Sequence, residues 1–106
     1  MQKIKEQYLR EQLPDDYKSD IEKAIYILTS EGCDEIYLFG SLVNGNISPR
    51  SDIDLAVKGL SDRVFFEVLG KLLVTLDHPV DLLSLEDETR FVNLLKKRGE
   101  LVRVAW

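Results

Sequence analysis

The chain has 106 residues, of which 44% are hydrophobic and 31% are charged, which is typical of one globular domain, here residues 1–106, and argues against disorder. No apolar run approaches the roughly 20 residues that span a bilayer, and the charged N-terminal stretch has no secretory signal. A net charge of −5 disfavours unaided binding to nucleic acid. The single Cys33 and single His78 exclude an internal disulfide and a Cys/His zinc site. We therefore expect a cytoplasmic protein without direct nucleic-acid or membrane contact.

Helical and strand patterns alternate along the chain. They predict, in chain order, helices over 4–12 and 17–32, a strand over 35–39, a turn over 40–45, a strand over 52–57, a helix over 61–76, a strand over 80–85, a helix over 86–98 and a strand over 100–105. Tyr26, Tyr37 and Phe39 fit core positions, whereas His78 is expected to be a loop histidine without a function. Alternation of this kind predicts an α/β protein, a sheet covered by helices.

The stretch from Leu38 to Leu55, LFGSLVNGNISPRSDIDL, contains the strongest chemical signal. Gly40 and Ser41 end a strand before a short helical turn, where backbone N–H groups suit a phosphate. Asp52 and Asp54 lie on one face of the next strand because strand side chains alternate with period two. Their carboxylates repel each other unless a cation lies between them, and magnesium prefers such oxygens. A phosphate site beside a metal site predicts phosphoryl or nucleotidyl transfer.

Asp81 lies in the apolar strand HPVDLLSL. An ionised carboxylate buried there is costly unless it is paired or bound to metal. If this strand lies beside the Asp52–Val57 strand, Asp81 reaches the face that carries Asp52 and Asp54. The carboxylates of the three aspartates are then placed to hold a pair of metal ions, with Asp81 placed to accept a proton.

The motifs GSLVNG, SDIDLAV and VDLL together resemble the Gly-Ser, Asp-x-Asp and distal Asp pattern of the DNA polymerase β superfamily of nucleotidyltransferases. The short length makes the chain similar to the minimal nucleotidyltransferase (MNT) domains, antitoxins that are paired with HEPN-domain ribonuclease toxins. The resemblance covers most of the chain, including RFVNLLKKRGELVRVAW near its end. It implies a small mixed β-sheet with helices packed largely on one side.

The resemblance also implies roles for individual residues. Asp52, Asp54 and Asp81 would be catalytic and would hold two Mg²⁺ ions, or Mn²⁺, while Gly40, Ser41 and Ser51 would bind ATP. The implied reaction transfers AMP from ATP to a hydroxyl, a tyrosine, of the partner toxin, in a homo- or hetero-oligomer.

The Gly-Ser turn departs from the family pattern. Family members commonly carry a basic residue there, but Leu42, Val43 and Asn44 are uncharged. Arg50 is the nearest replacement within the loop. The departure keeps open a second hypothesis, that the protein neutralises its partner by complex formation without catalysis. Transfer to a small molecule such as an aminoglycoside is a weaker alternative, because the chain has no spare length for an acceptor domain.

Each motif also has a purely structural explanation. Gly40 and Gly45 suit turns with positive φ, Ser51 and Asp52 suit a turn that enters a strand, and Asp81 suits an edge-strand charge that opposes aggregation. These explanations account for each residue separately, whereas the nucleotide and metal hypothesis accounts for all of them together.

Overall fold

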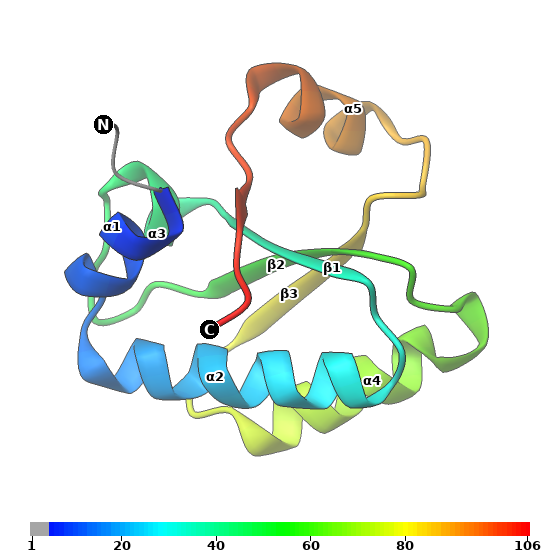
Figure 1. Ribbon diagram of the computed structural model, residues 1–106, viewed down its shortest axis with the longest axis horizontal. Helices are drawn as coiled ribbons and strands as arrows, with labels where there is room; N and C mark the ends of the chain where they lie inside the picture. The colour runs from blue at the N-terminus through cyan, green and yellow to red at the C-terminus, as the bar shows by residue number, and fades with distance from the viewer. Residues whose placement is uncertain (1–4) are drawn as a thin grey trace.

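The computed structural model describes residues 5–106. Ile4, at the start of the first predicted helix, lies outside this range. The elements alternate along the chain as predicted (Figure 1): α1 (Lys5–Gln12), α2 (Asp15–Ser30), β1 (Glu35–Phe39), α3 (Ser41–Asn44), β2 (Ile53–Lys58), α4 (Asp62–Thr75), β3 (Val80–Ser84), α5 (Arg90–Arg98) and β4 (Val102–Arg103). No helix within residues 5–106 is both long and apolar enough to cross a membrane.

The strands form one mixed sheet in the order β3-β2-β1-β4. β1 pairs antiparallel with β2 and with β4, whereas β2 and β3 are parallel. Parallel neighbours need a crossover connection, which α4 supplies. Figure 1 shows α2 and α4 on one face of the sheet and α5 on the opposite face. The structure therefore confirms the predicted small mixed sheet, with the two longest helices on one side.

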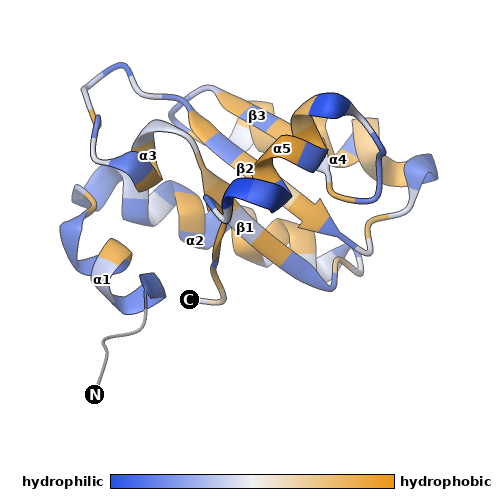
Figure 2. Cartoon of the chain, turned by 90° about the horizontal axis from the view of Figure 1, so that it is seen from above, coloured by the Kyte–Doolittle hydropathy of each residue, from blue (hydrophilic) through white to orange (hydrophobic). Residues whose placement is uncertain are grey.

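Apolar side chains form a core on each face of the sheet, and Figure 2 shows the strands as largely hydrophobic. The larger core joins the sheet to α2 and α4 and includes the fully buried Ile21, Leu28, Leu38, Leu55 and Leu72. The smaller core joins the other face to α5 and contains Phe39, Ala56, Leu85, Val92 and Leu95. Each face is thus fixed by a separate cluster, and the small core sets the position of α5 over the sheet.

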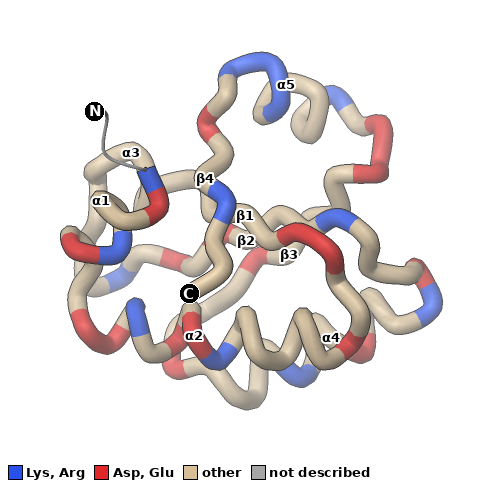
Figure 3. The backbone as a smooth tube through the Cα atoms, in the orientation of Figure 1, with Lys and Arg blue, Asp and Glu red and all other residues tan. Residues whose placement is uncertain are grey.

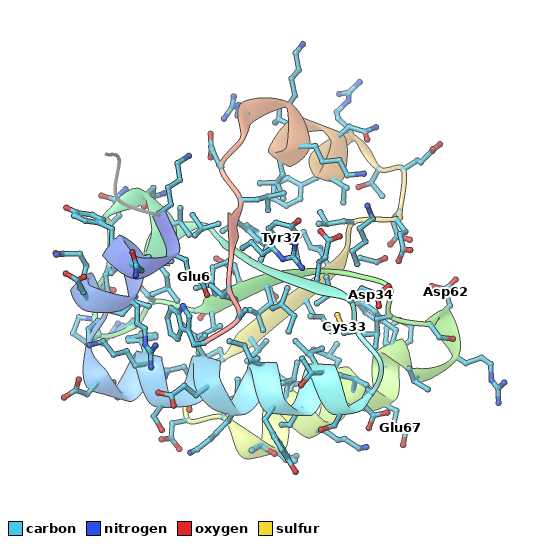
Figure 4. The ribbon with its side chains drawn as sticks, viewed as in Figure 1. Glu6, Cys33, Asp34, Tyr37, Asp62 and Glu67 are labelled. Atoms are coloured by element: carbon cyan, nitrogen blue, oxygen red, sulfur yellow. The ribbon has the colours of Figure 1, made fainter. Side chains whose placement is uncertain are left out.

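Cys33 follows α2 and is buried. Figure 4 shows it near the start of β1. Its Sγ donates to the backbone carbonyl oxygens of Glu35 and Lys58 at 3.3 and 3.4 Å. The side chain therefore joins the ends of two neighbouring strands.

Some predicted boundaries and core positions are wrong. α5 begins at Arg90 and not at residue 86, because the Thr89 hydroxyl accepts a hydrogen bond from the Val92 N–H at 3.1 Å and caps the helix there. β4 has only two residues. Tyr26 is 74% exposed because it lies one helical position away from the buried Ile25, about 100° around α2.

Candidate active site

Asp54 and Asp81 come from neighbouring parallel strands and lie directly opposite each other in the register of β2 and β3. Asp54 is half-buried and also lies opposite Phe39 of β1. Asp52 precedes β2 and is exposed. Asp81 is exposed as well, so the expectation that its carboxylate is buried was wrong. The carboxylate that is partly buried is that of Asp54, on β2. The predicted adjacency of the two strands is confirmed.

The electrostatics of this pair favour a cation. The pKa of Asp54 is raised from 3.8 to about 6, first by burial and then by the negative charges of Asp81 and Asp52, with a hydrogen bond to Asp81 adding to the effect. A carboxyl group with such a pKa is destabilised as an anion, here by burial and by its negatively charged neighbours. Carboxylate oxygens are the ligands that Mg²⁺ prefers, so the donor set fits this metal.

The geometry does not by itself assemble the full predicted site. Within residues 5–106, no group of three or more His, Cys, Asp or Glu side chains is arranged to hold a metal ion. Asp54 and Asp81 are close to each other, while Asp52 lies outside the strand. The shared metal role of the three aspartates stays a prediction.

Gly40 directly follows β1 and precedes α3, a single helical turn. Its φ of 76° and ψ of −150° are reached at low cost only by glycine. Its carbonyl oxygen accepts hydrogen bonds from the N–H groups of Val43 and Asn44, both at 3.0 Å. Leu42 is 1% exposed and belongs to the larger core. A buried leucine in the turn explains why residue 42 carries no charge for a phosphate.

A cleft of about 580 Å³ lies between this edge of the sheet and α5. Its sheet side contains Phe39, Gly40, Asp54 and Asp81, and its α5 side contains Phe91, Leu94 and Arg98, with Glu100 beyond the helix. The cleft thus joins the glycine of the Gly-Ser turn to the aspartate pair. Arg50 is exposed and is not among the residues that line it.

The loop that leads to Asp52 is held by α2. The Tyr17 hydroxyl donates to the Ser51 carbonyl oxygen at 2.6 Å and lies 3.3 Å from that of Ser48. Burial, followed by the negative charge of Asp16, raises the pKa of Tyr17, so its hydroxyl stays protonated at neutral pH. The Ser51 hydroxyl accepts a hydrogen bond from the Ser48 N–H at 2.9 Å. Ser51 therefore shapes the loop, and its contact with nucleotide stays a prediction.

Sequence reasoning missed the network behind this loop. Asp20 is fully buried and accepts hydrogen bonds from the N–H groups of Asp77 at 3.1 Å and His78 at 2.9 Å. His78 Nδ1 lies 2.7 Å from Asp20 Oδ2, and the His78 ring stacks on Tyr17 at 3.8 Å between centroids. This network joins α2 to the segment before β3. One signal could have found it: Asp20 lies on the apolar stripe of α2, beside Tyr17, Ile21 and Ala24 at helical spacing.

The model of the polymerase beta nucleotidyltransferase family matches residues 18–103. The chain belongs to this nucleotidyltransferase family. The family prediction is therefore confirmed, and so is the class of enzyme. A comparison with curated protein sequences finds no significant match.

Several solved structures of toxin–antitoxin complexes are similar to this member of the nucleotidyltransferase family. A tyrosine-to-alanine mutant of the MntA–HpeT pair is 30% identical, with a TM-score of 0.62 over 80% of this chain and 71% of that chain. A toxin–antitoxin with AMP-PNP is 28% identical, with a TM-score of 0.61 over 85% and 72%. A complex of tri-AMPylated Shewanella oneidensis HEPN toxin with MNT antitoxin is 27% identical, with a TM-score of 0.57 over 81% and 69%. The resemblance to MNT antitoxins is thus confirmed.

Proposed function

We propose that this protein is a cytoplasmic antitoxin that transfers AMP from ATP to a tyrosine hydroxyl of a partner HEPN-domain ribonuclease toxin. The observation that carries the proposal is the pairing of Asp54 with Asp81 in a cleft that also contains Gly40. Two relatives support the donor and the acceptor, one with AMP-PNP and one in complex with a tri-AMPylated HEPN toxin.

The proposed roles extend the pairing of Asp54 with Asp81. Asp52, Asp54 and Asp81 would hold a pair of Mg²⁺ ions, for which Mn²⁺ is also suited. When bound, these ions would neutralise charge on the triphosphate and favour deprotonation of the acceptor hydroxyl. Gly40 and Ser41 would offer backbone N–H groups to the phosphates. Residue 40 must be glycine in this role, because a side chain there would collide with Asp54.

In the proposed reaction, the acceptor oxygen attacks the α-phosphorus of ATP. A new P–O bond forms, the bond from the α-phosphorus to the oxygen that bridges to the β-phosphate breaks, and pyrophosphate leaves with that electron pair. The hydroxyl proton passes to Asp81, which is exposed at the cleft and therefore accessible to an acceptor.

Intact-mass spectrometry tests the proposal. The protein encoded by the neighbouring gene is incubated with this protein, ATP and Mg²⁺, and we expect a gain of one or more AMP units. Asp54→Asn should abolish the gain, while Asp87→Asn, an exposed loop change outside the cleft, should leave it intact. Transfer that persists in Asp54→Asn would contradict the assigned chemistry.

A non-catalytic antitoxin is the second candidate function, and the uncharged turn with its buried Leu42 favours it. Under this alternative, the Asp52→Asn, Asp54→Asn double variant would still protect cells from the toxin. Under the enzyme proposal, protection disappears although the complex still forms, which pull-down from the same cells would show.

A further inference from the structure

The cleft poses a charge problem for a nucleotide. A triphosphate that enters it approaches the carboxylates of Asp54, Asp81 and Glu100, which all line the cleft. The Gly-Ser turn supplies no compensating side-chain charge, and its Leu42 is committed to the core. Metal ions held by the aspartates would offset only part of this repulsion, since those carboxylates neutralise much of the metal charge. A further cation at the cleft would therefore favour binding.

Among the described residues that line the cleft, Arg98 is the cation. It is the last residue of α5, and the small apolar core fixes that helix over the sheet. Figure 3 shows the basic residues at this end of α5. Lys96 and Lys97 share the helix end but do not line the cleft. All three positive charges can stabilise the C-terminus of the helix equally. Of the three residues, Arg98 is the one that lines the cleft.

The present partner of Arg98 is weakly held. Arg98 Nη1 lies 3.8 Å from Glu100 Oε1, and the two side chains are 61% and 51% exposed. An exposed ion pair at this distance contributes little to stability. Exchange of the Glu100 carboxylate for phosphate oxygens would therefore cost little. The guanidinium group is also suited to the exchange, because its planar fork binds phosphate through two parallel hydrogen bonds.

We propose that Arg98 binds the triphosphate of ATP and replaces the basic residue that the Gly-Ser turn lacks. Glu100 is the intramolecular competitor that Arg98 leaves when the nucleotide enters. This inference rests on the proposed function, because it concerns the same cleft and the same donor. It moves the phosphate-binding cation from the loop, where Arg50 was expected, to the end of α5.

Isothermal titration calorimetry with ATP and Mg²⁺, without an acceptor, measures the effect. Arg98→Gln should weaken ATP binding by about tenfold or more, as expected for loss of hydrogen bonds to a charged group. Lys97→Gln is the matched control, since it removes the same charge from the same helix end, and it should bind ATP almost as wild type does. Arg98→Lys should fall between Arg98→Gln and wild type because it keeps the charge but loses the fork. Thermal unfolding should be equal in Arg98→Gln and Lys97→Gln.

The competitor gives an independent readout. Glu100→Gln should tighten ATP binding, because it frees Arg98 and removes a negative charge. The gain in ATP affinity should be smaller in the Arg98→Gln background, since only the removal of the Glu100 charge contributes there. Equal gains in both backgrounds, or equal binding by Arg98→Gln and Lys97→Gln, would overturn the role of Arg98.

The failure of this inference is distinguishable from that of the proposed function. Wild-type protein that transfers AMP, with binding unchanged in Arg98→Gln, contradicts only the inference. Wild-type protein that binds ATP through Arg98 but modifies no partner contradicts only the transfer reaction. Wild-type protein that binds no ATP contradicts both.

Discussion

The carboxylate of Asp54 occupies the space in which a side chain at Gly40 would begin. A Cβ built on Gly40 would lie 2.1 Å from Asp54 Oδ2, far inside van der Waals contact. The glycine that follows β1 and the carboxylate on β2 are therefore in close contact, and a side chain on residue 40 would displace Asp54. Residue 40 must therefore be glycine for two independent reasons, its positive φ and its close approach to Asp54.

Gly40→Ala should reduce stability and abolish AMP transfer. The new methyl group must displace Asp54, and the strained backbone costs on the order of 1–3 kcal/mol. Gly45→Ala is the matched control, because its φ is 90° but nothing lies within 4 Å of an added Cβ. It should lose less stability in urea denaturation, because only its positive φ opposes a side chain, and it should keep its transfer activity. Equal activities in the two variants would contradict the steric coupling of Gly40 to Asp54.

Asp54→Asn should stabilise the metal-free protein at neutral pH. The folded-state pKa of about 6 lies above the ordinary aspartate value of 3.8, so the folded state binds the proton more tightly between these values. The contribution of this group to stability is therefore largest below about pH 4 and decreases as the pH rises through about 6. Asp54→Asn removes the ionisable group, so the variant should not lose this stability and its unfolding free energy should vary less with pH between about 4 and 6.

Urea denaturation in EDTA from pH 4 to 8 measures this effect. Asp87→Asn, in the exposed loop before α5, is the control and should follow the wild-type profile. An Asp54→Asn protein that is less stable than wild type at pH 7.5 would show that the carboxylate is compensated within the fold.

Tyr17→Phe should slow AMP transfer and lower the free energy of unfolding by about 1–2 kcal/mol, because it leaves the Ser51 carbonyl oxygen without its 2.6 Å donor. The loop before Asp52 then loses its anchor to α2, while the aromatic ring can still stack on His78. Tyr26→Phe removes an equivalent hydroxyl from a residue that is 74% exposed, and it should alter neither quantity. A Tyr17→Phe protein with wild-type kinetics would show that this anchor is not needed for the placement of Asp52.

Asp20→Asn should destabilise the fold by about 1–3 kcal/mol, since an amide group replaces a buried acceptor of several hydrogen bonds. Asp16→Asn is a suitable comparison because Asp16 Oδ2 also contacts His78, at 3.1 Å, but its side chain is 60% exposed. That substitution should cost about 0.5 kcal/mol or less. Thermal and urea unfolding of both variants measure the difference. Equal losses of unfolding free energy would mean that the burial of Asp20 does not determine how much its hydrogen bonds stabilise the fold.

The order of the elements and the Asp-x-Asp motif were predictable because their signals are local. Helical spacing predicted α2 and α4. The predicted strand with Asp54 is β2, although β2 begins at Ile53 and leaves Asp52 just outside it. The turn at Gly40 was also visible, since glycine marks a backbone that other residues avoid. Local signals failed at the start of α5, where the Thr89 cap outweighed the acidic residues before it.

The sequence by itself determined the family motifs, the alternation of helices and strands, and the residue types available for chemistry. Only the tertiary structure decided that Asp54 faces Asp81, that Asp54 is the carboxyl group with the raised pKa, and that Arg98 lines the cleft. The physical reason is that strand register and helix placement depend on packing between residues far apart in the chain. Sequence spacing records the period of each element, whereas the burial and charge of a side chain depend on which other elements pack around it.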